Sequence, residues 1–177
     1  MIKNRLYLAG FVLVISTASS LAAQTSTGTL TVTATVTSSI NLIFNSDASG
    51  VALTGSGSNA ATLALGNISA FGTLATGVTR PTVTATTFTV SSAMDVNVTK
   101  ANSTSANYTL KAQLGSADAT NSWTVGGVAV TSTSAATVSA TGSYATNNNY
   151  AVGLTVPFAT ATATVISNTV NFTATAN

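Results

Sequence analysis

The chain has no cysteine, no histidine and no glutamate among its 177 residues. Without cysteine there is no disulfide framework and no thiolate chemistry. Without histidine a Ser-His-Asp triad cannot be built, and zinc lacks its usual ligands. We therefore expect a protein that is not an enzyme, with no catalytic residue, no metal site and no cofactor.

The three carboxylates of the chain do not form a recognisable catalytic or calcium-binding motif. Asp47 and Asp118 occur in turn sequences, where aspartate usually accepts local hydrogen bonds. Asp95 is expected on the solvent face of a strand, as are Lys100 and Lys111. This placement argues against an internal isopeptide bond, which requires a buried acid beside the lysine, and the absence of a clustered acidic loop argues against calcium.

Charge is also scarce, because charged residues make up only 5% of the chain, against about 25% in typical proteins. Hydrophobic residues still make up 45%, so the composition is not that of a disordered protein. Outside Lys3 and Arg5, three basic and three acidic residues cancel. A neutral chain is not expected to bind nucleic acid, and it resists self-association poorly, which suits a subunit that polymerises.

Residues 1–23 have the pattern of a bacterial secretory signal. Two basic residues precede the apolar run Leu6–Ile15, and the small residues Ser16–Ala23 follow it, with cleavage expected after Ala22 or Ala23. The alternative is a membrane-anchoring helix, but the run is shorter than the ~20 residues that a span needs. We expect a helical signal that is cleaved, export to the periplasm and then to the cell surface, and no stable membrane insertion.

The stretch that follows the signal alternates strictly between apolar residues and threonine. Period two is the strand period, so residues 28–37 are predicted to form a strand with one apolar face. Such a strand must place its apolar row in a groove, either of its own domain or of another molecule. The sequence leaves these two alternatives open. The apolar row consists of Leu30, Val32, Ala34 and Val36.

The remainder of the chain predicts an all-β domain, because short alternating segments are separated by turn sequences every 8–12 residues or so. No helical periodicity is present outside the signal. Residues 24–177 are therefore predicted to form a single antiparallel β-sandwich. The expected strands include Val83–Val90, Met94–Val98 and Tyr108–Leu114, with a Gly-Gly hairpin at Trp123–Val130 and turns at Asn45–Gly50 and Asn147–Asn149.

The aromatic residues divide into two groups. Tyr108 and Trp123 lie in alternating apolar segments, so we expect them in the core. Tyr144 and Tyr150 flank the polar segment Asn147–Asn149 and are the candidates for an exposed contact with a ligand such as a sugar.

Several short motifs together resemble the spore coat protein U family, the archaic chaperone–usher pilins. They cover most of the chain after the signal, although each motif is short. Pilins of this family usually carry a cysteine pair, which this chain lacks. The resemblance therefore implies that this chain is a distant, cysteine-free relative of the family. The motifs are Gly28 with Val32 in the first strand, Phe71–Leu74, Phe88–Val90, Tyr108–Leu110 ahead of Gly115, and Ile166–Phe172.

The resemblance implies an immunoglobulin-like sandwich that lacks one strand. In that family the N-terminal strand of the next subunit fills the open groove, and a periplasmic chaperone and an outer-membrane usher assist assembly. Leu30, Val32, Ala34 and Val36 would be the inserted row of a homopolymeric fibre or surface layer. Two alternatives remain: a self-complete secreted sandwich that binds carbohydrate or a surface ligand, and a threonine-face binder such as an ice-contacting protein.

We predict that the folded chain resists trypsin. Arg80 is followed by proline, so only Lys100 and Lys111 offer cleavable bonds after the expected signal. Mass spectrometry should find the folded chain intact under conditions that cut the urea-unfolded chain after both lysines. Equally fast cleavage of folded and unfolded chains would contradict a compact β-domain.

Overall fold

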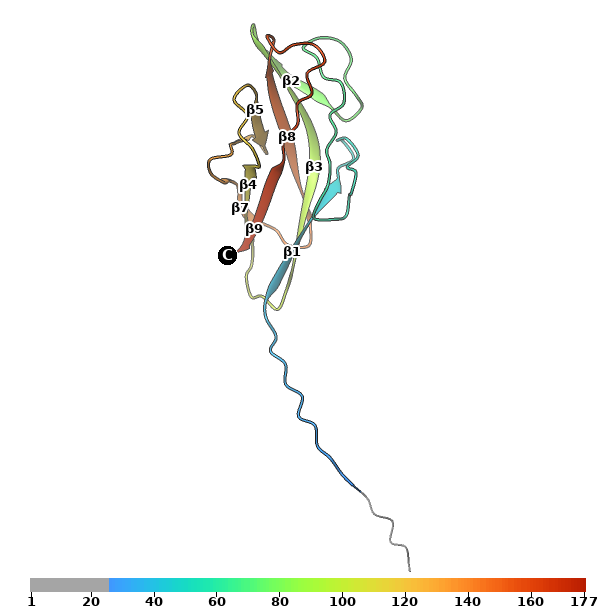
Figure 1. Ribbon diagram of the computed structural model, residues 1–177, viewed down its shortest axis with the longest axis vertical. Helices are drawn as coiled ribbons and strands as arrows, with labels where there is room; N and C mark the ends of the chain where they lie inside the picture. The colour runs from blue at the N-terminus through green and yellow to red at the C-terminus, as the bar shows by residue number, and fades with distance from the viewer. Residues whose placement is uncertain (1–25) are drawn as a thin grey trace, which may run out of the picture. The chain divides into compact units, whose positions relative to one another are not determined.

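The computed structural model describes residues 26–177 (Figure 1). The predicted signal peptide, residues 1–23 with its helix, lies outside these residues. The chain divides into two units between Thr35 and Val36, and each is described by itself below.

The described residues contain nine strands and no helix, so no helix among them could cross a membrane. The prediction of an all-β, antiparallel protein is confirmed. The strands are β1 Ser39–Ser46, β2 Thr79–Val83, β3 Thr87–Ala101, β4 Tyr108–Leu114, β5 Ser122–Val125, β6 Val128–Val130, β7 Ala136–Gly142, β8 Asn147–Pro157 and β9 Val170–Ala176.

The strands form two sheets, and every pair of neighbours is antiparallel. The larger sheet has the order β1-β3-β8-β5-β6, with β2 also paired to β3. The smaller sheet has the order β7-β4-β9, so β9 is one of its edges. In Figure 1 the strands of both sheets run along the long axis of the unit formed by residues 36–177.

The two sheets share a core because their strands alternate apolar and polar residues. Val90, Val96 and Val98 of β3 are fully buried, and so are Leu110 and Ala112 of β4 on the other sheet. Each large apolar side chain buried in this way contributes roughly 1.5–3 kcal/mol to folding. Tyr108 and Trp123, at 0% and 9% exposure, belong to this core as predicted.

The predicted Gly-Gly hairpin is confirmed. β5 and β6 pair with Trp123 opposite Val130, and the turn between them is Gly126–Gly127. Both glycines have positive φ, 56° and 79°, which a two-residue primed turn requires. Of the turn predicted at Asn45–Gly50, the part from Asp47 to Gly50 is present, with Asp47 accepting a hydrogen bond from the backbone N of Ser49 at 2.8 Å, whereas Asn45 and Ser46 still belong to β1.

The predicted turn at Asn147–Asn149 is wrong, since these residues begin strand β8. The turn lies earlier, around Ala145, whose φ is 56°. The side-chain amide of Asn148 donates to the carbonyls of Ser143 and Thr146, at 3.0 and 3.1 Å. Asparagine therefore stabilises the preceding turn from within the strand.

The predicted strands Val83–Val90 and Met94–Val98 are also divided differently. The chain turns after Val83, where the Thr84 hydroxyl accepts hydrogen bonds from the backbone N of Thr86 and Thr87. β3 then continues without a break to Ala101. A threonine-rich segment has strand propensity throughout, so its composition did not reveal this side-chain-capped turn.

The prediction that Asp95 faces solvent is wrong, because it is only 8% exposed. Its strand is central, and its backbone neighbours are Asn45 of β1 and Asn149 of β8. Asn149 donates a hydrogen bond to the Asp95 carboxylate at 3.1 Å. Lys111, by contrast, is exposed as predicted.

We predict that Gly142→Ala destabilises the domain. A Cβ at this position would lie 2.3 Å from Cζ of Tyr108, whose ring is fully buried and cannot move aside. Overpacking of this kind typically costs about 1–3 kcal/mol. Urea denaturation should show this loss, whereas Gly28→Ala, which has no atom within 4 Å of its new Cβ, should leave the midpoint unchanged. Equal midpoints for Gly142→Ala and the parent chain would contradict the tight contact.

Candidate functional site

The predicted donor row lies in solvent. Residues 26–38 form no strand hydrogen bonds. Leu30, Val32 and Val36 are 88%, 80% and 73% exposed, and Ala34 is exposed as well. Large exposed apolar patches are uncommon on monomeric soluble proteins and often mark interaction sites.

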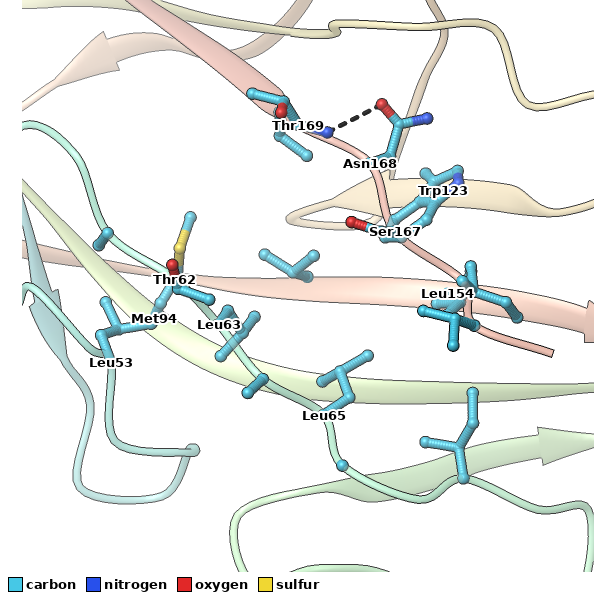
Figure 2. A pocket seen from close by; sticks show the side chains of 18 of the residues that line it. Leu53, Thr62, Leu63, Leu65, Met94, Trp123, Leu154, Ser167, Asn168 and Thr169 are labelled. Carbon is cyan, nitrogen blue, oxygen red and sulfur yellow. Dashed lines mark hydrogen bonds between the residues drawn. The ribbon is translucent and has the colours of Figure 1, made fainter. Parts of the chain in front are cut away.

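A groove of about 860 Å³ opens in the other unit, residues 36–177. Its floor is apolar and includes Met94 of β3, Val152 and Leu154 of β8, and Trp123 of β5. Figure 2 shows Met94, Leu154 and Trp123 between two segments of chain that carry Leu63 and Leu65 on one side and Ser167 and Asn168 on the other. These two walls are residues 61–68 and 163–170.

Among the described residues, the first wall is paired through its backbone only at Thr62, which bonds to Thr54 in both directions. Leu63 and Leu65 are half-buried and pack against the two halves of the core, while Ala64 and Gly66 between and after them are exposed. Within residues 26–177, the backbone of residues 63–68 makes no hydrogen bond. This wall thus presents free N–H and C=O groups beside an apolar surface.

The second wall leads into β9, which is also unpaired on one side. β9 bonds to β4 along its whole length, from Val170 opposite Leu114 to Ala176 opposite Tyr108, and it is the edge of its sheet among the described strands. An edge strand with a free row of backbone groups is a template for another strand.

An aromatic pair lies at one end of the groove. The rings of Phe44 in β1 and Phe172 in β9 contact edge to face, with centroids 5.2 Å apart. Both residues line the groove. β1 of the larger sheet and β9 of the smaller sheet are therefore in contact at this point of the groove.

The Trp123 side chain on the groove floor is oriented by Asp118. Its indole N–H donates to the Asp118 carboxylate at 2.8 Å, and the backbone N of Thr120 and of Asn121 donate at 3.1 and 2.9 Å. Desolvation alone would raise the pKa of Asp118, but these hydrogen bonds outweigh it and lower the pKa to about 2. A carboxylate that accepts several N–H bonds is held in its ionised form.

The two tyrosines predicted as exposed ligand contacts are both half-buried. The Tyr144 ring packs on Tyr108, with centroids 5.3 Å apart, and Lys100 Nζ lies 4.9 Å from its centroid. Tyr150 packs against both parts of the core. Their role in ligand contact stays a prediction, and neither lines the groove.

The three aspartates lie in separate places. Asp47 bonds to Ser49 in its turn, Asp95 to Asn149, and Asp118 to the segment around Trp123. Within residues 26–177 no three acidic, cysteine or histidine side chains gather in a group that could hold a metal ion.

Comparison of the chain with protein-family models, with curated proteins and with solved structures gives no match. The exposed row and the groove are therefore the features from which its function is inferred.

We predict that Asp118 stabilises the fold in a pH-dependent way. Its pKa is about 2 in the folded state against an ordinary 3.8, so the contribution is complete above about pH 4 and disappears as the pH falls through 2. Thermal melts between pH 2 and 7 should show the parent chain more stable than Asp118→Asn near neutrality, with the difference closing toward pH 2. A difference that does not change with pH would contradict the assignment.

Proposed function

We propose that this protein is a secreted structural subunit of an extracellular fibre or surface layer, in which the N-terminal strand of one copy fills the groove of the next. The observation that carries the proposal is the presence, in one chain, of an exposed apolar row and an apolar groove with unpaired edges.

The strand order supports an immunoglobulin-like sandwich that lacks one strand. β1, β3, β8, β5 and β6, with β2 also paired to β3, form one sheet, and β7, β4 and β9 form the other, in which the missing strand would lie beside β9. This arrangement is the one implied by the resemblance to the spore coat protein U family. The same resemblance implies two partners. A periplasmic chaperone would cover the groove before assembly, and an outer-membrane usher would assist assembly.

The row matches β9 in length and in alternation. The segment from Leu30 to Val36 has the same number of residues as β9, seven, which is about 20 Å of strand. Inserted beside β9, its apolar side chains would face inward, and its threonines would lie on the outer face beside Asn171, Thr173 and Thr175. The part of the row beside Val170 and Phe172, the two β9 residues that line the groove, would enter it. Its backbone would pair with β9 on one side and with residues 63–68 on the other.

The energetics favour insertion. Burial of each large side chain of the row is worth roughly 1.5–3 kcal/mol, and the new hydrogen bonds satisfy backbone groups on two edges. The neutral charge of the chain without Lys3 and Arg5 adds no repulsion between copies. Loss of rotational and translational freedom opposes binding. Because row and groove belong to one chain, every copy can act as both donor and acceptor, and assembly can continue into a polymer.

Chain length favours insertion into another copy. β9 runs toward the end of the domain where β1 begins. Its last residue, Ala176, pairs with Tyr108, the first residue of β4. Only a short loop separates Tyr108 from Ala101 of β3, which pairs with Ser39 at the start of β1. A strand antiparallel to β9 would therefore finish at the opposite end, about 20 Å from Ser39. Thr37 and Ser38 span only about 10 Å, so the row cannot occupy its own groove in this direction.

Val32→Asp should prevent assembly. A buried, unpaired carboxylate in the groove costs far more than the lost apolar contact contributes. Thr33→Asp is the matched control, since it adds the same charge one residue along, on the face expected to remain in water. Size-exclusion chromatography and electron microscopy of the exported chains should find polymers for the parent and Thr33→Asp, and monomers for Val32→Asp.

A second measurement separates this proposal from a self-complete sandwich. A chain lacking residues 24–36 should fold and bind a synthetic peptide of residues 26–38 with a rise in melting temperature. The same peptide with Val32→Asp should not bind. Normal fibres from full-length Val32→Asp, or unfolding of the shortened chain, would refute strand donation.

A further inference from the structure

A pair of phenylalanine rings lies exposed on the surface, outside the groove. Phe71 is 73% exposed and Phe158 is 40% exposed, and their centroids are 6.1 Å apart. Phe158 in turn stacks on Phe88 of the core, with centroids 6.3 Å apart. We call Phe71 and Phe158 the aromatic cap. Two adjacent exposed rings form an apolar patch.

The structure holds Phe71 in this exposed position. The Arg80 guanidinium donates from Nε to the carbonyl of Ser69 and from Nη2 to that of Gly72, both at 2.9 Å. The Ser69 hydroxyl donates to the carbonyl of Phe71. An aromatic side chain on a braced loop loses little conformational entropy on binding, which is the property of a binding anchor.

The cap lies at the end of the domain opposite the start of β1. Phe158 directly follows β8, whose last residue, Pro157, pairs with the first residue of β3, Thr87. The backbone N of Phe158 bonds to the carbonyl of Thr86 in the preceding turn, at 2.7 Å. Figure 1 shows this end of β8 and β3 at the top and the start of β1 at the bottom.

We propose that the aromatic cap is the contact surface for the next copy of this chain in the fibre. This inference rests on the proposed strand donation. In the proposed donation the inserted strand runs antiparallel to β9, as β4 does on the other side of β9. Its last apolar residue, Val36, then finishes at the end that carries the cap.

The short connection then sets which surfaces meet. Only Thr37 and Ser38 separate Val36 from β1 of the donating copy, so β1 must begin within about 10 Å of the acceptor's cap end. The end of the donor where β1 begins, which includes Ser39 and loop 102–107, is thereby held against the acceptor. The residues of loop 102–107 have small and polar side chains, and the ammonium of Lys100 donates to the carbonyl of Ser105 in this loop.

Engineered disulfides test this contact directly, because the chain has no cysteine of its own. Fibres of Phe71→Cys combined with Ser39→Cys should form a ladder of covalent oligomers on mild oxidation. Ala129→Cys combined with Ser39→Cys is the control, since Ala129 is exposed on the edge strand β6, away from the cap. A ladder from the control pair alone, equal ladders from both pairs, or no ladder from intact Phe71→Cys fibres would overturn the inference.

Removal of one ring gives a second readout. Phe71→Ser, which removes the more exposed ring, should leave assembly intact but make fibres release monomers at a lower urea concentration, whereas Thr73→Ala in the same loop should not. Phe158 is left in place because it stacks on Phe88 of the core. Phe71→Ser should not alter the melting temperature in the monomeric Val32→Asp chain. A lower melting temperature there, or unchanged fibre stability, would overturn the inference.

The two proposals fail separately. If Val32→Asp still gives fibres, strand donation is wrong and the cap inference falls with it. If Val32→Asp is monomeric but Phe71→Ser affects only adhesion to a polysaccharide, donation stands, and the cap binds a surface ligand and not the next copy.

Discussion

The constraint on which the rest of this structure depends is the free edge of β9 beside an apolar groove. A β-strand satisfies its backbone only when it has a neighbour on each side or water in its place. Here the groove beside this edge has an apolar floor that includes Met94 and Leu154, which are themselves buried, and Phe172, which is half-buried. The free backbone edge and this floor are the features that the proposed occupant, an extended segment with alternate apolar residues, would cover.

The core does not depend on that occupant. Tyr108 is fully buried between the sheets, burial raises its pKa to about 12, and its hydroxyl accepts a hydrogen bond from Asn148 at 3.1 Å. Val90, Val96 and Leu110 are also inaccessible to water. The domain can thus persist with an empty groove, although the leucines of residues 61–68 are then only half covered.

Sequence periodicity was sufficient for the fold class, the Gly-Gly hairpin and the core positions of Tyr108 and Trp123, because each depends on local alternation or local turn chemistry. Periodicity gave wrong predictions where residues far apart in the sequence determine the environment of a side chain or the position of a turn. Asp95 is buried by neighbours on β1 and β8, and Asn148 stabilises a turn that precedes it in the chain. The alternating pair Leu63 and Leu65 was a signal for the groove wall, but only the structure shows that residues 61–68 and 163–170 face each other.

The two-residue connection between the exposed row and β1 has a mechanical consequence. In a fibre of the proposed kind, the donated strand and β1 are one continuous backbone lying along the direction of pull. Tension would then load all the lateral hydrogen bonds of the inserted strand at once, in shear, instead of opening them one after another. Such a fibre would resist mechanical rupture far better than the modest strength of any single hydrogen bond suggests.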